Sequence, residues 1–186
     1  MSARVVLGIA GASGAALGLS VARQLAGLGA EVDLVTTKAA ERTLTTECGV
    51  DAPEKLRRLV TRAHPIEDIG AAIASGSSPV AGMIVAPCSM RSLAAIATGL
   101  DDNLLTRAAG VQLKERRRLV LLTREAPLTL AHLRNMTLAT EMGAIILPPV
   151  PAFYLAPRTI DDIIEQIAAR AIDQIRIAEP LAQSWG

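Results

Sequence analysis

The stretch Arg4-Val-Val-Leu-Gly-Ile-Ala-Gly11-Ala-Ser13-Gly14 decides how this chain folds. Its first half is a short apolar run with β-branched residues that stops at glycine, as a buried parallel strand does. Residues 14–28 follow with leucine and valine at helical spacing, and residues 31–36 are expected to form a second strand. This order predicts a βαβ unit at the start of the chain.

The same alternation of strands and helices continues along the chain. Apolar runs predict further strands at residues 83–86, 119–123 and 144–147. Helical patterns fall at residues 38–46, 53–62, 89–97, 103–115, 128–142 and 160–175, and residues 67–78 form a connector. Short connections between alternating elements predict an α/β fold, a three-layer α/β/α Rossmann-like sandwich around a doubly wound, mostly parallel sheet. With 186 residues, we expect a single domain over 1–186.

The composition limits the classes of function. A hydrophobic share of 51% and a charged share of 20% are typical of a folded chain, and a net charge of +1 without an extended basic face argues against nucleic-acid binding. No apolar run has the length of a secretory signal or a membrane span, so we expect a cytoplasmic protein without membrane contact. Cys48 and Cys88 lack metal-ligand spacing and are expected to be free thiols. Cys88, His64 and His132 are interpreted as structural residues, since neither histidine lies in a recognisable catalytic motif.

Ligands of such sheets bind outside the carboxyl ends of the strands. The loop Gly11–Gly14 leads from a strand into a helix, where backbone N–H groups and the helix dipole favour an anion such as phosphate. Its glycine spacing is not that of the dinucleotide fingerprint. The second strand ends in Thr36-Thr37-Lys38, without the acidic residue that binds the ribose of NAD. A mononucleotide is therefore the better fit, and tight turn geometry is the structural alternative.

Several segments together resemble the UbiX flavin prenyltransferases. They are Gly11-Ala-Ser13-Gly14-Ala, Lys38-Ala-Ala, Ala74-Ser-Gly-Ser, Pro87-Cys-Ser89, Leu113-Lys114-Glu-Arg-Arg, Arg124-Glu125-Ala-Pro127 and Pro148-Pro-Val-Pro-Ala-Phe-Tyr154. They occur in family order, and the resemblance runs from Val5 to Trp185. It implies a homo-oligomeric Rossmann-like flavoprotein, often a dodecamer, that transfers a dimethylallyl group from dimethylallyl phosphate or diphosphate to reduced FMN, at N5 and then at C6. The prenylated FMN serves UbiD-type decarboxylases, which is why older descriptions call the family decarboxylases.

The resemblance also implies the site residues. The flavin site falls on Gly11, Ala12, Ser13, Thr37, Ser89, Met90, Arg91, Ser92 and Arg124. The donor phosphate falls on Arg107, Lys114, Tyr154 and Arg170, some of them contributed by a neighbouring subunit. Ser13, Glu47 and Glu125 match the catalytic groups, and no metal is implied. Many members have an aromatic residue at Leu17 and a histidine at Leu155.

These residue types suit the chemistry. An allylic phosphate leaves as an anion, so its departure calls for fixed cations and hydroxyl donors. Attack by N5 and ring closure at C6 each release a proton, which suits two carboxylates and a hydroxyl. We expect Glu125 to shuttle a proton beside the dimethylallyl group, and Ser13 and Glu47 to relay the proton from N5. The departing phosphate is an alternative base.

Other interpretations stay open. Arg107 and Lys114, seven apart on one helix, also fit a solvated stripe, Glu125 also fits a helix cap, and Tyr154 also fits a packing anchor. A flavin-dependent cysteine decarboxylase of the same fold is a second candidate function. That group has a Pro-Ala-Ser-Ala-Asn-type segment and an early histidine that this chain lacks. A non-catalytic nucleotide-binding subunit is the third.

Overall fold

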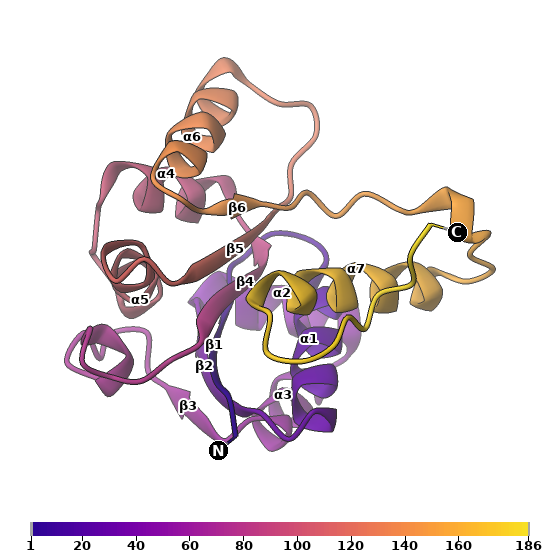
Figure 1. Cartoon of the computed structure of the whole chain (residues 1–186), viewed down its shortest axis with the longest axis horizontal. Coiled ribbons are helices and arrows are strands. Elements are labelled where there is room, and N and C mark those ends of the chain that lie inside the picture. The colour runs from indigo at the N-terminus through magenta and orange to yellow at the C-terminus, as the bar shows by residue number, and fades with distance from the viewer. Residues whose placement is uncertain (1, 186) are drawn as a thin grey trace.

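A computed structural model describes residues 2–185 (Figure 1). Its centre is a six-stranded sheet in the order β3-β2-β1-β4-β5-β6. Every pairing between these strands is parallel, which confirms the predicted α/β fold. The strands are β1 (Arg4–Ile9), β2 (Glu31–Thr36), β3 (Arg62–His64), β4 (Gly82–Cys88), β5 (Arg118–Thr123) and β6 (Ile145–Ile146).

The helices lie close to their predicted positions. They are α1 (Ala15–Gly27), α2 (Lys38–Cys48), α3 (Ala52–Leu59), α4 (Met90–Thr98), α5 (Leu104–Lys114), α6 (Leu130–Glu141) and α7 (Ile160–Ile175), with 3₁₀ turns η1 (Ala72–Ala74) and η2 (Phe153–Leu155). Within residues 2–185, none of these helices combines the length and the apolar character that crossing a bilayer requires.

Two expectations about the strands are wrong. The helix expected at residues 53–62 ends at Leu59, because Arg62 begins the edge strand β3, whose exposed residues carry no apolar pattern. The strand expected to stop before Pro87 runs on to Cys88. The pairing of β4 with β5 shifts register between Val85 and Cys88, so the ladder passes the proline nitrogen without needing its missing N–H.

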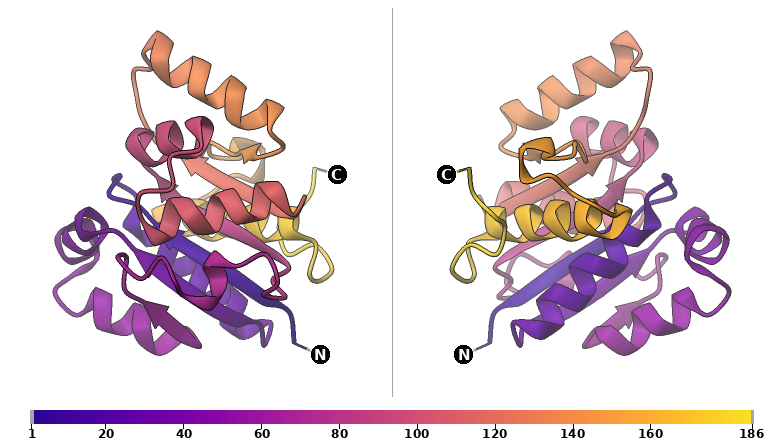
Figure 2. Two further views of the ribbon diagram at one scale, coloured as in Figure 1. Left: turned by 90° about the vertical axis from the view of Figure 1, so that its left-hand side faces the viewer. Right: turned by 90° about the vertical axis from the view of Figure 1, so that its right-hand side faces the viewer.

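One apolar core lies on each face of the sheet. In β5, Val120 and Leu122 join the core beneath α1, α2, α3 and α7, whereas Leu119 and Leu121 join the core beneath α4, α5 and α6. This is the alternation that a strand buried on both sides requires. Figure 2 shows the α5 face in its left view and the α7 face in its right view. Side chains on α5 and on α7 are therefore separated by the sheet.

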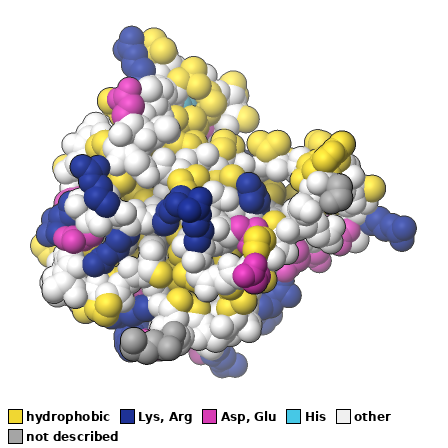
Figure 3. Space-filling view, viewed as in Figure 1, with side chains coloured by type: hydrophobic (Ala, Val, Ile, Leu, Met, Phe, Trp, Pro, Cys, Tyr) yellow, Lys and Arg dark blue, Asp and Glu magenta, His cyan; other side chains and the backbone are white. Residues whose placement is uncertain are grey.

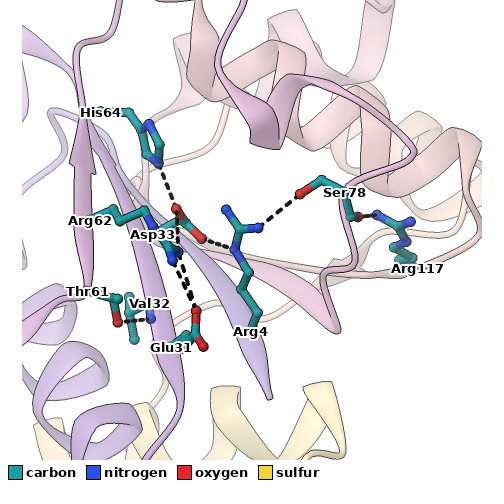
Figure 4. A network of polar contacts seen from close by, with 9 residues as sticks. All are labelled: Arg4, Glu31, Val32, Asp33, Thr61, Arg62, His64, Ser78 and Arg117. Carbon is teal, nitrogen blue, oxygen red and sulfur yellow. Dashed lines mark hydrogen bonds and ion pairs between the residues drawn. The ribbon is translucent and has the colours of Figure 1, made fainter. Parts of the chain in front are cut away.

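A buried carboxylate ties the first three strands together (Figure 4). Asp33 is fully buried and accepts hydrogen bonds from Arg4 and, at 2.7 Å, from His64 Nε2. Burial alone would raise the pKa of Asp33, but its hydrogen bonds with Arg4 and His64 hold that pKa below its ordinary value. His64 thus has the structural role expected of it.

Candidate functional site

Four neighbouring strands, β2, β1, β4 and β5, end at one edge of the sheet. The segments that follow them are joined there by backbone hydrogen bonds. The Thr37 N–H donates to the Ile9 carbonyl at 3.0 Å, and the Arg124 N–H donates to the Cys88 carbonyl at 3.1 Å. This edge therefore carries all of the predicted flavin residues, namely Gly11, Ala12, Ser13, Thr37, Ser89, Met90, Arg91, Ser92 and Arg124.

Gly11 lets the first of these loops touch the start of α2. A Cβ atom on Gly11 would lie 2.2 Å from the Cβ of Ala39, a distance that no real pair of carbon atoms tolerates. Gly14, at the start of α1, has φ 105°, which favours glycine. These glycines thus make a tight turn with close helix packing, and the same contact brings the loop next to Thr37.

The N-terminus of α1 is occupied by a carboxylate of the same chain. Oε2 of Glu47 accepts the backbone N–H of Gly14 at 2.8 Å and that of Ala15 at 2.9 Å. These two donors are therefore used within the chain, and the expectation of a phosphate at the loop Gly11–Gly14 stays a prediction. Other groups at this edge are open to an anion, and the exposed Arg124 is a cation among them.

Glu47 also acts together with two predicted site residues. Burial alone would raise the pKa of Glu47, but the N–H groups of Ala15 and Gly14, the Ser13 hydroxyl and the charge of Arg124 together hold that pKa below its ordinary value. The structure thus brings Ser13, Glu47 and Arg124 into one cluster. Glu47 is a carboxylate at neutral pH, able to accept a hydrogen bond from the exposed Ser13 hydroxyl.

The start of α4 is held by serine hydroxyls. Ser89 caps the helix, since its Oγ accepts the Ser92 N–H at 3.2 Å and also lies 3.2 Å from the buried Ser92 hydroxyl. Met90 is half-buried against the core beneath α4, α5 and α6. Arg91 is exposed and forms an ion pair with Asp102, so its guanidinium already has an acidic partner.

A cavity of about 430 Å³ brings together two of the predicted donor-binding residues. It is lined by Tyr154 of η2 and Arg170 of α7, and also by Trp185. The rings of Tyr154 and Trp185 meet edge to face, with centroids 4.8 Å apart and planes at 68°. Leu155 lines a separate cavity of about 710 Å³, so the position where many family members have histidine belongs to different surroundings.

The other two predicted donor-binding residues lie elsewhere. Arg107 and Lys114 are on α5, across the sheet from Arg170. Arg107 pairs with Asp101 at 3.1 Å, and Lys114 pairs with Glu115. The four residues therefore do not meet within one chain.

Glu125 follows Arg124 directly and is exposed in the single chain. One of its carboxylate oxygens accepts the N–H of Ala126 at 3.1 Å. The interpretation of Glu125 as a helix cap is wrong, because Thr129 caps α6 in a capping box with His132. His132 is thus structural, as expected.

Two further observations concern reactive groups. Burial raises the pKa of the Cys88 thiol to about 12, so this cysteine is a protonated core residue, as expected. Among residues 2–185, no three histidine, cysteine, aspartate or glutamate side chains are grouped closely enough to hold a metal ion.

Gln166 and Asp173 of α7 were not among the predicted site residues, although both line the Tyr154 cavity. Their spacing from Arg170, four residues before and three after, places all three on one side of the helix. In the sequence alone, that spacing is indistinguishable from the pattern of any solvated helix face.

Comparison with known proteins places these features in context. The family model described as Flavoprotein matches residues 1–172. The flavin prenyltransferase UbiX of Thauera aromatica is 50% identical over 98% of this chain and 93% of its own length. A crystal structure of AnUbiX in complex with FMN and dimethylallyl pyrophosphate superposes with a TM-score of 0.96 at 45% identity, covering 100% of this chain and 98% of that one.

Two other structures define the limits of the similarity. A dodecameric FMN-dependent UbiX-like decarboxylase from Escherichia coli O157:H7 has a TM-score of 0.93 at 41% identity, covering 98% of this chain and 99% of that one. The FMN-dependent cysteine decarboxylase TvaF covers 95% of this chain and 99% of its own, with a TM-score of 0.66 at 16% identity. The latter likeness is one of fold alone.

Proposed function

The chain belongs to the flavoprotein family and, within it, to the UbiX flavin prenyltransferases, and we propose from this premise which residues carry out the reaction. It is an enzyme, a prenyltransferase that transfers a dimethylallyl group to FMN. The observation that carries this function is the match, over the whole chain, to a structure whose ligands are FMN and dimethylallyl pyrophosphate. Cysteine decarboxylases are far more distant.

FMN is held at the edge formed by the ends of β2, β1, β4 and β5. The residues there fit the flavin and its phosphate, because Gly11 leaves the loop without a side chain, Thr37 and Ser89 offer hydroxyls, and Arg124 offers a cation. When bound, reduced FMN supplies the two ring positions, N5 and C6, that receive the dimethylallyl group. Arg91 contributes through its main chain, since its guanidinium is paired with Asp102.

The donor phosphate is bound by Tyr154 and Arg170 of one chain and by Arg107 and Lys114 of a neighbouring chain. The sheet separates the two pairs within a subunit, so a complete phosphate site requires a second copy. Arginine offers a planar fork to phosphate oxygens and lysine a compact charge, and together they stabilise the leaving anion.

A homo-oligomer is also favoured by the surface of the single chain. Large apolar side chains are exposed on α6, between β6 and the start of α7, and near the end of the chain. They include Leu130, Val150, Phe153, Ile160 and Trp185. Figure 3 shows apolar side chains gathered over α6 and beside the C-terminal segment. The similar E. coli protein is a dodecamer, and we infer an assembly of that kind here.

The protons released at N5 and C6 leave through side chains of this chain. The Ser13 hydroxyl donates its hydrogen bond to the Glu47 carboxylate, which is ionised at neutral pH. This orientation leaves a lone pair of Ser13 Oγ free to accept the proton from N5. A carboxylate with a lowered pKa holds a proton only briefly, so Glu47 takes the proton that Ser13 relays from N5 and releases it to solvent. Glu125, open to solvent in the single chain, passes a proton outward from the dimethylallyl group.

The product, prenylated FMN, is a cofactor for a UbiD-type decarboxylase, and we infer that such an enzyme in the cytoplasm receives it. One experiment tests the function directly. The purified protein is incubated with reduced FMN and either dimethylallyl phosphate or dimethylallyl diphosphate, and the extracted flavin is examined by mass spectrometry. A flavin heavier by one five-carbon prenyl unit is the expected result. An unchanged flavin, with either donor, would contradict the assignment and favour a nucleotide-binding subunit.

A further inference from the structure

The segment after α7 turns back and runs alongside that helix (Figure 1). The turn begins at Arg176, whose φ of 60° ends the helix. We call residues 176–185 the tail. Its last described residue, Trp185, lies against Tyr154 at the wall of the donor cavity.

Two side chains of α7 bind the backbone of the tail. Both carboxylate oxygens of Asp173 are used, since Oδ1 accepts the Leu181 N–H at 2.7 Å and Oδ2 accepts the Ala182 N–H at 3.2 Å. Gln166 makes a paired contact with Gln183: its Nε2 donates to the Gln183 carbonyl at 2.9 Å, and its Oε1 accepts the Gln183 N–H at 3.0 Å. We call these four hydrogen bonds the clasp.

The geometry of the clasp fixes where the tail ends. Gln166 and Asp173 lie seven residues apart, two turns on one side of α7, and they hold the tail in antiparallel order. Arg170 lies between them on the same side. Because Gln183 is bound two residues before Trp185, the clasp brings the indole onto Tyr154 beside the Arg170 guanidinium.

The clasp also separates two cavities. Gln166 and Gln183 line both the donor cavity and the larger, neighbouring cavity of about 710 Å³. The Gln166 side chain and the Gln183 backbone, which hydrogen-bond each other, therefore form part of the wall between the two cavities. An undocked tail would therefore remove Trp185 from the donor cavity and open that cavity on this side.

We propose that Asp173 and Gln166 are positioning residues for prenyl transfer, which act through the tail to keep Trp185 as a wall of the donor cavity. The clasp orders the tail before the donor binds, so donor binding does not have to include the conformational entropy cost of ordering the tail. The dimethylallyl group then meets a preformed apolar wall. This inference rests on the proposed assignment of the Tyr154 and Arg170 cavity to the donor. The position of the tail itself does not depend on that assignment, which allows the two to be tested separately.

Trp185 is the single tryptophan of the chain and reports on the tail without any ligand. In Asp173→Ala and Gln166→Ala, we expect tryptophan emission that is less polarised than in the wild type, because the indole of an undocked tail reorients faster. Asp173→Asn keeps the size of the side chain but replaces one acceptor by a donor, so an intermediate change is expected. Glu179→Ala, in an exposed part of the tail, is the matched control and should behave like the wild type.

Steady-state kinetics then connect the tail to the reaction. If the docked fraction of the tail falls to about a tenth, the apparent KM for dimethylallyl phosphate rises about tenfold, while the Kd for FMN is unchanged. Circular dichroism confirms that each variant is folded. If Asp173→Ala does not fold, Asp173→Asn is used in its place. Tryptophan polarisation at the wild-type level in both alanine variants would overturn the clasp. Lowered polarisation with an unchanged donor KM would overturn its positioning role.

Failure of the donor assignment gives a different pattern. In that case Arg170→Ala leaves the donor KM unchanged, while Asp173→Ala still lowers the polarisation of the Trp185 emission. That result would overturn the positioning role and the donor assignment together, but would leave the docked tail standing. Support for the proposal requires that Arg170→Ala, Asp173→Ala and Gln166→Ala all raise the donor KM and that Glu179→Ala does not.

Discussion

The carboxylate of Glu47 accepts the backbone N–H of Gly14 at 2.8 Å, so a side chain near the end of α2 closes the first turn of α1. This single contact joins the loop after β1 to the helix after β2. It also places an ionised group beside Ser13 in the proposed flavin site. The same carboxylate thus stabilises the fold and has a part in the proposed reaction.

Glu47→Gln separates these two contributions by their pH dependence. The pKa of Glu47 is lowered in the folded chain, so its charge stabilises the fold above the ordinary glutamate pKa of 4.5, and this stabilisation disappears as the pH falls through the lower, folded value. We expect Glu47→Gln to be less stable than the wild type at about pH 7 and equally stable in strong acid. Urea unfolding followed by far-ultraviolet circular dichroism measures the difference. A difference that is independent of pH would contradict this role.

Gly11→Ala tests the contact between the first loop and α2. The new Cβ would lie 2.2 Å from the Cβ of Ala39, so the backbone must shift, at a cost of about 1–3 kcal/mol in the free energy of unfolding. FMN affinity should fall as well, since the loop lies at the flavin edge. Ala39→Gly in the same chain removes the colliding atom and should recover part of both losses. No recovery in the double variant would show that the contact is not the cause.

Arg170→Ala tests the donor cavity. Removing a charge-assisted contact to phosphate should weaken donor binding by about 10- to 150-fold, with FMN affinity nearly unchanged. Arg158→Ala is the matched control, because Arg158 lines the cavity of about 710 Å³ and not the donor cavity. Calorimetric titration with dimethylallyl phosphate distinguishes the two. Donor binding that is weakened more by Arg158→Ala than by Arg170→Ala would place the donor in the cavity of about 710 Å³ instead.

Arg107→Ala tests whether the phosphate site is shared between subunits. Arg107 and Arg170 lie on opposite faces of the sheet, so they can meet at one phosphate only if they come from two chains. Each variant alone lacks one of the two arginines at every site and should lose activity. Co-expression of Arg107→Ala with Arg170→Ala chains should restore part of the activity, because some interfaces then combine two intact halves. Light scattering establishes that mixed oligomers form. Mixed oligomers without any regained activity would contradict a phosphate site that is shared between subunits.

Glu125→Gln tests the second carboxylate. The change keeps the size of the side chain and removes its titratable group, so donor and FMN should both bind while turnover falls by about 10²–10⁴. Rapid-mixing measurements of the flavin spectrum give the rate, and binding titrations provide the control. Turnover at the wild-type rate would leave Glu125 with only its contact to Ala126.

The sequence predicts most of the fold because both faces of the sheet are covered. Arg4–Ile9 is then an almost continuous apolar run, and the predicted bounds of this strand and of Glu31–Thr36 match the structure. The edge strand Arg62–His64 could not be predicted, since only one residue of it is even half-buried and its pairing with β2 is non-local. Pro87 misled the prediction because a register shift lets the strand pass it.

Only the location of the candidate flavin site could be predicted from the order of the strands. Residues at strand ends follow from topology, so the flavin edge could be located from the apolar runs and the turns between them. Glu47 as the cap of α1 could not, because its partner Gly14 lies 33 residues away and depends on how α2 packs. The clasp at Gln166 and Asp173 binds backbone groups, which leave no signature in the partner's sequence. The boundaries of the single domain over 1–186 stay a prediction.

The chain has one phenylalanine, one tyrosine and one tryptophan, and all three are exposed: Phe153 at 75%, Tyr154 at 51% and Trp185 at 77%. Tyr154 and Trp185 line the donor cavity. Both cores, by contrast, consist of aliphatic side chains, with a few from methionine and cysteine. Ultraviolet absorption and intrinsic fluorescence of this protein are therefore insensitive to its interior. A melting curve recorded by tryptophan emission would follow release of the tail or separation of subunits, and it would misstate the temperature at which the sheet itself unfolds.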